Sequence, residues 1–249
     1  MTTILYHGEP NGPSLTVLAA AFEKHVDLSL ERIDLVAGGR HTGGIPRAME
    51  IDLSIEGEGP VLVVDGTPMA DSVFVACYLD DVGAGTPLRP ANPYARWQVM
   101  AWCRHVIERI APAAAYLGLS DAPPRAVPAG IASVDLADRW RAAVEGQFDQ
   151  AKLDDSRSKI AQGVDKLEAQ LADGRDWLMG DFGIADLESY AWLAGMPRLM
   201  PDAFASHPRT VAWLDRVKAR PSVARALSLA TTPVPEAVWA PGPEINRWG

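Results

Sequence analysis

The chain of 249 residues is 48% apolar and carries a formal net charge of −9 at pH 7. This length can bury one large core or two modest ones. The acidic charge argues against nucleic acid and anionic membranes as partners, because both reward clusters of Lys and Arg. No basic segment precedes a long apolar run at the start, and no stretch approaches the roughly 20 apolar residues that span a bilayer. We therefore expect no signal peptide, no membrane segment and a cytoplasmic location.

The cysteines and histidines are sparse. The chain has two cysteines, Cys77 and Cys103, and both fall within helical patterns. Burial is the expected role of each, and a disulfide is not expected in a cytosolic protein. The five His residues are scattered and form no cluster with metal-ligand spacing, so no metal site is expected.

The first part of the chain alternates strand and helix patterns. Residues 4–6 and residues 28–34 predict two short strands. Apolar residues recur at helical spacing between them, at Leu15, Val17, Leu18, Ala21 and Phe22. Ser14 directly precedes this pattern and is a candidate N-cap of the helix. Residues 38–44 are rich in Gly and predict a loop.

A strand, a turn, a strand and a helix follow in close succession. Residues 61–64 predict a strand, residues 65–66 (Asp-Gly) a hairpin turn, and residues 69–70 the return strand. Ser72 then stands directly before an apolar helical pattern, where an N-cap belongs. Backbone N–H groups at a helix start attract an anion, and a Ser hydroxyl adds a donor. A carboxylate ligand is therefore the expected occupant of this junction.

The element order β-α-β then β-β-α is the thioredoxin-like pattern. No CxxC motif is present, which disfavours thiol–disulfide exchange by the protein's own cysteines. The pattern changes after a linker at residues 84–92, which contains Gly, Thr and Pro. From there on the chain predicts only helices, over residues 93–117, over residues 132–172 with an interruption near 154–156, and from residues 181, 206 and 221 onward. A Pro-rich tail begins at residue 231.

Several of these motifs resemble those of the glutathione S-transferases. In that family a Pro with a cis peptide bond opens the third strand, and an acidic residue or Gln, followed by Ser, holds the γ-glutamyl end of glutathione. Pro60 and the pair Asp71-Ser72 stand at the matching positions. Residues 183–186 resemble the family's N-capping box, with Gly183 in place of the hydroxyl residue. Residues 213–223 resemble its late-helix signature. The resemblance covers almost the whole chain.

The resemblance implies a fold and a division into domains. The expected fold is α+β: a thioredoxin-like N-terminal domain at residues 1–83 that binds glutathione, followed by the linker and an all-α domain at residues 93–249 that binds the second substrate. Family members pair through the first domain and the early helices of the second. A homodimer, or a heterodimer with a related subunit, is therefore implied.

The resemblance also assigns roles to residues. Ser14 would donate a hydrogen bond to the glutathione sulfur, with Asn11 as a second donor, and His41 would face the glycyl carboxylate of glutathione. A helix start also favours a thiolate over a thiol. Capping of the helix alone is the competing role for Ser14, since Ser is common at N-caps. The alternatives for Asn11 and His41 are an ordinary turn residue and a solvated loop residue.

The run from Gly12 to Leu15 and the long C-terminal half look like the bacterial β-aryl-etherase branch, which cleaves lignin-derived aryl ethers with glutathione. The aromatic substrate would need an apolar slot. Helical residues that are candidates for its walls, each also a candidate for plain core, are Met100, Trp102, His105, Tyr116, Trp192 and Met196.

The stretch before Pro60 departs from the family pattern. The Asn-Pro turn is missing, the loop looks about two residues longer, and Gly59 replaces the Val whose backbone pairs with the cysteinyl part of glutathione. Glu56 and Glu58 add negative charge beside a site for an anion, which should weaken binding by Coulomb repulsion. Asp71 is one methylene shorter than Glu.

Three functional hypotheses remain from the sequence. The first is an active glutathione-dependent β-etherase or related transferase. The second is a subunit of the same fold with weak or no activity that serves as a dimer partner, and such a subunit should be unstable without its mate. The third is a glutathione-dependent reductase or peroxidase, which usually wants a Cys at the position of Ser14. Thiolate formation separates the first hypothesis from the second.

Overall fold

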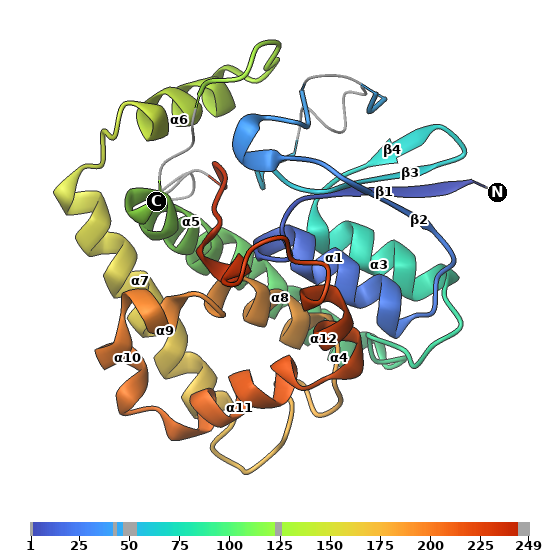
Figure 1. Ribbon diagram of the computed structural model, residues 1–249. Coiled ribbons are helices and arrows are strands. Elements are labelled where there is room, and N and C mark those ends of the chain that lie inside the picture. The colour runs from blue at the N-terminus through green and yellow to red at the C-terminus, as the bar shows by residue number, and fades with distance from the viewer. Residues whose placement is uncertain (1, 42–43, 47–53, 123–125, 244–249) are drawn as a thin grey trace.

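The computed structural model describes residues 2–41, 44–46, 54–122 and 126–243. Its sheet has the strands β1 (Thr3–His7), β2 (Ser29–Arg32), β3 (Val61–Val64) and β4 (Thr67–Met69), in the order β2-β1-β3-β4. β1 pairs with β2 in parallel and with β3 antiparallel, and β3 pairs antiparallel with β4. The helices α1 (Gly12–Glu23) and α3 (Ser72–Val82) lie together on one face of this sheet (Figure 1). The thioredoxin-like arrangement is thus confirmed.

The hairpin between β3 and β4 is determined by the residues of its own turn. Asp65 and Gly66 have φ angles of 47° and 85°. Two successive positive φ values are those of the turn whose twist matches paired strands, and Asp-Gly adopts it readily. The return strand covers residues 67–69 instead of the predicted 69–70, because its register against β3 is fixed directly by the two-residue turn.

The second half is helical, as predicted. α4 (Pro93–His105) continues through a π-helical turn (Val106–Ile110) into α5 (Ala111–Asp121). The later helices are α6 (Val134–Val144), α7 (Gln150–Gln170), α8 (Ile184–Leu193), α9 (Met196–Leu199), α10 (Pro201–Ala205), α11 (Pro208–Lys218) and α12 (Pro221–Leu227).

The predicted interruption near residues 154–156 is wrong. The break lies earlier, between α6 and α7, where Gly146 has a φ of 65° and the Asp149 carboxylate caps α7 by accepting the N–H of Lys152. The acidic run at 154–156 is tolerated within α7 because Asp154 and Asp155 pair with cations along the same helix, at Arg157 and Lys159.

α8 joins the two halves of the molecule. All of its residues are buried, and it packs against α1, α3 and α4. Asp186, three residues after the cap residue Gly183, accepts the N–H of Gly183 at 3.1 Å, which confirms the predicted capping box. The same carboxylate also accepts the N–H of Leu178 at 3.0 Å and the indole N–H of Trp213 at 2.8 Å. Burial raises its pKa to about 6.

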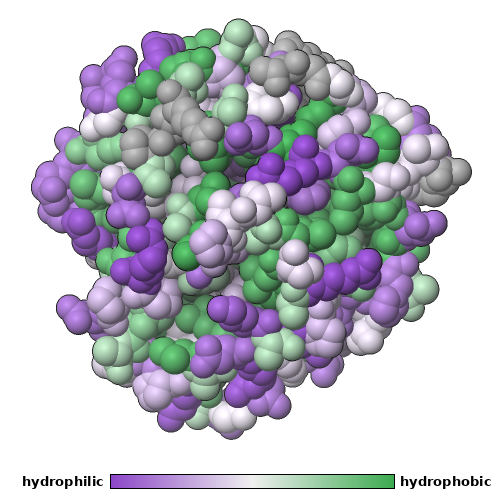
Figure 2. Space-filling model, in the orientation of Figure 1, coloured by the Kyte–Doolittle hydropathy of each residue, from purple (hydrophilic) through white to green (hydrophobic). Residues whose placement is uncertain are grey.

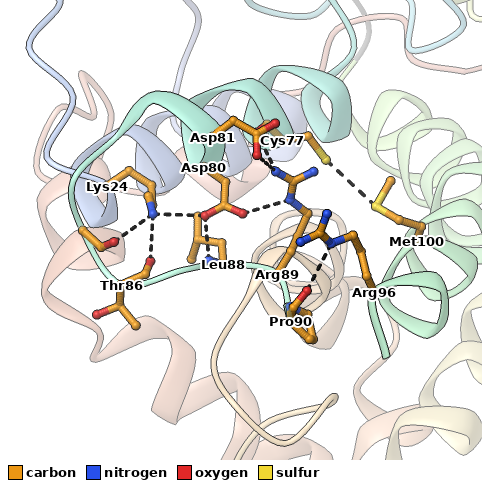
Figure 3. A network of polar contacts seen from close by, with 11 residues as sticks. Lys24, Cys77, Asp80, Asp81, Thr86, Leu88, Arg89, Pro90, Arg96 and Met100 are labelled. Atoms are coloured by element: carbon orange, nitrogen blue, oxygen red, sulfur yellow. Dashed lines mark hydrogen bonds and ion pairs between the residues drawn. The ribbon is translucent and has the colours of Figure 1, made fainter. Parts of the chain in front are cut away.

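A polar network ties residues 85–89, which lie between α3 and α4, to Lys24 and Asp80 (Figure 3). The ammonium of Lys24 donates to the carbonyls of Gly85 and Thr86 at 2.8 and 3.2 Å and lies 3.1 Å from Asp80. Asp80 in turn accepts from the guanidinium of Arg89 at 2.9 Å. The side chains of Lys24 and Asp80 are almost fully buried, so the pair fixes the path of the chain between the two halves.

Hydrophilic and apolar residues are interspersed over the face shown in Figure 2. Among the described residues, no helix has both the length and the apolar character to cross a membrane. Cys77 lies in α3 and Cys103 in α4, and both are free thiols.

Candidate functional site

A cavity of about 330 Å³ opens beside the start of α1. Ser14 and Asn11 lie on its wall, together with Trp192 of α8 and residues 237–240 of the C-terminal tail. The structure thus brings the two predicted catalytic residues and one predicted pocket residue to one cavity. Aromatic and polar groups share its lining, which is typical of sites for small organic ligands.

Ser14 is not the N-cap of its helix. Asn11 holds that position, and Gly12 and Pro13 form the start of the first turn, where a missing Pro N–H costs nothing. The Ser14 Oγ instead accepts the backbone N–H of Gly8 at 3.1 Å. Within the described residues this is its one side-chain hydrogen bond, so its own hydrogen remains to donate. The competition between capping and ligand binding that the sequence suggests therefore does not arise.

The C-terminal tail closes one side of the cavity. The Asn11 Nδ2 donates to the carbonyl of Val238 at 3.0 Å, and the Trp239 ring stacks on Trp192 with centroids 6.2 Å apart. Two buried polar atoms here have no partner within the described part of the chain, the Asn11 Oδ1 and the Trp239 Nε1. A buried acceptor and a buried donor on one wall are the groups that a polar ligand would satisfy.

Gly118 in α5 lets the tail approach. A Cβ at this position would lie 2.4 Å from ring atoms of Trp239, so Gly118→Ala should displace the indole. We expect the substitution to lower the free energy of unfolding by about 1–3 kcal/mol, although Ala favours a helix over Gly by about 1 kcal/mol. Chemical denaturation of the variant measures this change.

Gly163→Ala in α7 is the matched control for this prediction. Its Cβ would meet only the flexible end of Ile110, at 2.9 Å, so a smaller loss or a gain of stability is expected. Equal effects of the two substitutions would show that the contact of Trp239 with Gly118 does not hold the tail.

The predicted anion site at the start of α3 is occupied by a side chain of the protein itself. Ser72 is the first residue of α3 and Asp71 is the cap residue, with a φ of 67°, so the prediction that Ser72 is the N-cap is wrong by one position. The Ser72 N–H donates to the Glu56 carboxyl at 2.7 Å, and the Ser72 hydroxyl donates to its other oxygen. Glu56 is 1% exposed.

Asp71 binds the same loop from the other side. Its carboxylate accepts the hydroxyl of Ser54 at 2.5 Å and the backbone N–H groups of Ile55 and Glu56. The side chain therefore holds the loop and does not cap α3. Burial raises the pKa of Asp71 despite these hydrogen bonds.

A third carboxyl group completes a buried chain of polar contacts. Glu188 of α8 accepts from Thr16 at 2.8 Å and from the indole N–H of Trp192 at 2.6 Å, and its carboxyl group lies 3.0 Å from the Ser72 hydroxyl oxygen. Burial raises the pKa of both Glu56 and Glu188. The chain links the start of α3 to Trp192 and hence to the wall of the cavity.

The Gly59–Pro60 region differs from the family pattern. The described residues contain no cis peptide bond, so the bond before Pro60 is trans and the expectation of a cis bond is wrong. A trans bond is the lower-energy isomer. The preceding Glu58 N–H donates to the carbonyl of Pro241 in the tail at 2.8 Å, and the Cβ position of Gly59 faces Pro13 at 3.6 Å. The backbone of the residue before Gly59 thus pairs with the tail.

His41 and Glu58 lie together. The His41 Nε2 is 2.5 Å from the Glu58 Oε1, which also accepts the indole N–H of Trp140 at 2.7 Å. The other oxygen of Glu58 is buried without a partner among the described residues, and Glu58 lines the 330 Å³ cavity. A role of His41 at the glycyl carboxylate of glutathione stays a prediction.

The predicted walls of a substrate pocket are dispersed. Only Trp192 lines the cavity beside Ser14, and Tyr116 lines a separate cavity of about 260 Å³ next to α6. Met100 contacts Cys77, and His105 lies edge-on to Trp102. The remaining candidates, Trp102 and Met196, pack into the core.

Sequence reasoning missed two groups that shape this site. Glu188 gave no motif signal, because a lone Glu in a helix reads as a solvated residue. The only sequence signals in the tail are its Pro content and Trp239, and neither predicts where the tail lies in the fold. Its contact with Asn11 spans 227 positions of sequence.

Comparisons with known proteins agree with this fold. Residues 124–221 match the family model of the glutathione S-transferase C-terminal domain. The protein LigF of Sphingobium sp. strain SYK-6 is 27% identical over 245 residues, which cover 90% of this chain and 92% of LigF. The crystal structure of that β-etherase aligns with a TM-score of 0.80, covering 92% of this chain and 99% of LigF.

Two further glutathione S-transferases are similar to this chain over most of its length. A glutathione S-transferase of Silene vulgaris is 24% identical over 91% of this chain and 98% of its own length. A structure from Methylobacillus flagellatus KT with glutathione bound has 20% identity and a TM-score of 0.67, covering 90% and 98% of the two chains, and supports the fold alone. The match of residues 124–221 to the C-terminal domain model, the two-part fold and the similarity to LigF along the chain thus make this protein similar to the glutathione S-transferases in both halves of the molecule.

Proposed function

We propose that this protein is a glutathione-dependent transferase that cleaves β-aryl ether bonds of lignin-derived aromatics in the cytoplasm. The observation that carries the proposal is the cavity beside Ser14, whose hydroxyl hydrogen has no acceptor among the described residues and whose wall also includes Trp192 and Trp239. The similarity to the β-etherase LigF supports the choice of substrate class.

The reaction is a displacement at carbon. The sulfur of the glutathione thiolate attacks the carbon that carries the aryloxy group, a C–S bond forms, and the C–O bond breaks. The bonding pair leaves with the aryl oxygen as a phenolate, which takes a proton from water. Ser14 would donate a hydrogen bond to the sulfur and stabilise the thiolate before attack. The stacked indoles would hold the aromatic ring of the ether.

The test is an assay on the purified protein with a β-aryloxy aryl ketone. We expect equal amounts of the free phenol and of the glutathione thioether, and no phenol without glutathione. Phenol release that does not depend on glutathione, or no release at millimolar glutathione, contradicts the proposal.

A weakly active dimer partner is the second candidate function, and two observations favour it. The Glu56 carboxyl group already accepts the Ser72 N–H that glutathione would need. Large aromatic side chains are also exposed on α3 and α4, with exposed fractions of 67% for Phe74 and 60% for Trp97. These two residues each lie one helical turn from the contacting pair Cys77 and Met100, so they share one surface.

We expect this surface to pair two subunits. Sedimentation velocity should give a dimer for the wild type and a monomer for Trp97→Glu, because a charge at a buried aromatic contact is costly. Val134→Glu is the control, since Val134 is 71% exposed on α6, and it should remain dimeric. A monomeric wild type, or a dimeric Trp97→Glu, rules out pairing through α3 and α4.

A further inference from the structure

We propose that the Glu56 side chain is a built-in occupant of the carboxylate-binding group at the start of α3, and that glutathione has to displace it. The inference rests on the proposed function and on the role at the γ-glutamyl end of glutathione that the family resemblance implies for Asp71 and Ser72. Glu56 then sets the affinity of the protein for glutathione, because it competes with glutathione for the donors of Ser72.

The contacts of Glu56 are those of a bound carboxylate ligand. Both of its oxygens are engaged, one by the backbone N–H of Ser72 at 2.7 Å and the other by the Ser72 hydroxyl. A backbone N–H at a helix start and an adjacent hydroxyl are the donors that favour a carboxylate. The side chain comes from a residue 16 positions earlier, so the loop delivers it as a tethered ligand.

Asp71 completes the likeness to a bound amino acid. The γ-glutamyl end of glutathione carries an ammonium group beside its carboxylate, and an acidic side chain is its natural partner. In this structure the Asp71 carboxylate is instead satisfied by the Ser54 hydroxyl and the N–H groups of Ile55 and Glu56. The loop therefore offers donors to Asp71 and a carboxyl to Ser72, as the ligand would.

The tail and the neighbouring loop keep Glu56 in place. Gly57 has a φ of 75°, and a Cβ there would lie 2.5 Å from the carbonyl oxygen of Pro241. The Glu58 N–H donates to that same carbonyl, and the Arg40 guanidinium donates to the carbonyl of Gly57. Displacement of Glu56 therefore requires residues 56–58 to give up some of these contacts.

A proton shared between Glu56 and Glu188 would lower the cost of holding these two carboxyl groups side by side. The Ser72 hydroxyl lies between Glu56 and Glu188 but has one hydrogen, so it can donate to only one of them. The carboxyl group that does not accept the Ser72 hydrogen can still form a hydrogen bond with the hydroxyl oxygen when it is itself protonated and donates. Burial and the charge of Glu188 raise the pKa of Glu56 well above its usual range, in agreement with a shared proton.

The consequence is a reduced affinity for the external ligand. When a site is open for only a fraction of the time, the apparent dissociation constant rises by the inverse of that fraction. Removing the Glu56 carboxyl should therefore tighten binding, in contrast to the loss expected for a residue that contacts the ligand. If the site is open a tenth of the time, the gain is about tenfold.

The first experiment uses acetate and does not involve glutathione. Glu56→Ala leaves the donors of Ser72 free, so acetate should raise the melting temperature of this variant and leave that of the wild type unchanged at equal ionic strength. Chloride is the control anion. Failure of acetate to stabilise Glu56→Ala more than wild type overturns the inference.

The second experiment is calorimetry with S-methylglutathione, which keeps the γ-glutamyl end and lacks a reactive thiol. We expect Glu56→Ala to bind it about tenfold more tightly than the wild type. Glu56→Gln retains the shape of the side chain without its charge and should fall between them, and it keeps the test available if the Ala variant folds poorly. Equal affinities in the wild type and both variants overturn the inference.

The two experiments separate the inference from the proposed function. Equal, measurable binding of S-methylglutathione by the wild type and both variants overturns the role of Glu56 but is compatible with the proposed transferase function. Acetate stabilisation of Glu56→Ala without any binding of S-methylglutathione contradicts both glutathione as the displacing ligand and the proposed function, although the self-occupied carboxylate site remains.

Discussion

Replacing Asp186 by Ala is expected to lower the free energy of unfolding by roughly 3–5 kcal/mol at pH 7. The substitution leaves three N–H donors in the core without an acceptor, those of Leu178, Gly183 and the Trp213 indole. Each unsatisfied buried donor costs about 1–3 kcal/mol, and local relaxation recovers part of the sum. Urea denaturation followed by tryptophan fluorescence measures the loss.

Asp186→Asn is the matched control. Its remaining oxygen can still accept from Leu178 and Trp213, which both bind the Oδ1 of Asp186, while the contact with Gly183 at the helix cap is lost. We therefore expect roughly 1–2 kcal/mol for Asn, less than for Ala. Equal losses in the two variants would show that the Oδ1 contacts contribute nothing.

The pH dependence of the same variants follows from the raised pKa. Asp186 has a pKa of about 6 in the folded state, above the ordinary value of 3.8. Between these values the folded state binds a proton that the unfolded state has released, so this group favours folding at low pH and loses that contribution as pH rises through 6. The stability gap between wild type and Asp186→Ala should thus be larger at pH 5 than at pH 7. A gap that narrows at pH 5 contradicts the assignment.

Ser14→Ala is expected to reduce turnover of the aryl ether about 100-fold, which is the usual cost of removing one preorganised donor from a developing or bound anion. The hydroxyl accepts from Gly8 and donates to no group in the described part of the chain, so the variant removes the donor to sulfur. Its effect on kcat should exceed that on KM for the ether, because the ether contacts the aromatic wall.

A stability measurement accompanies this variant. Losing the acceptor for the Gly8 N–H should cost about 1 kcal/mol, which leaves the protein folded. Turnover that remains within a factor of about three of wild type would assign Ser14 a purely structural role at this turn.

The hairpin and the helix cap at Gly183 could be predicted because their determinants are local. The turn needs residues that accept positive φ, and Asp65 and Gly66 supply them in sequence order. The cap requires an acceptor three residues into the helix, which Asp186 provides. Nothing distant is needed to specify either element.

The sequence predicts the wrong cap residues for α1 and α3, because neighbouring residues compete for the N-cap position. Ser14 and Ser72 are common cap residues, yet both lie inside their helices, and Asn11 and Asp71 take the cap positions. Neither cap residue binds its helix through the side chain, since Asn11 contacts the tail and Asp71 contacts the loop before β3. Tertiary contacts therefore decided where these helices begin.

The content of the site could not be predicted from the sequence. The sequence suggests that Glu56 is a repulsive charge beside an anion site, whereas in the structure its carboxyl group fills that site. The sign of its effect depends on whether the loop places the carboxyl on Ser72 or only near it, and sequence spacing does not determine this. The tail residues Val238 and Pro241 likewise reach the site only through the folded chain.

The most direct test of the central claim is the ultraviolet absorbance of the thiolate of glutathione bound to the wild-type protein, titrated against pH and compared with Ser14→Ala. A free cysteine thiol ionises near pH 8.5. We expect the bound glutathione to be a thiolate already at neutral pH in the wild type, and its ionisation to shift toward the free value in the variant. Bound glutathione that titrates like the free thiol in both proteins would contradict it.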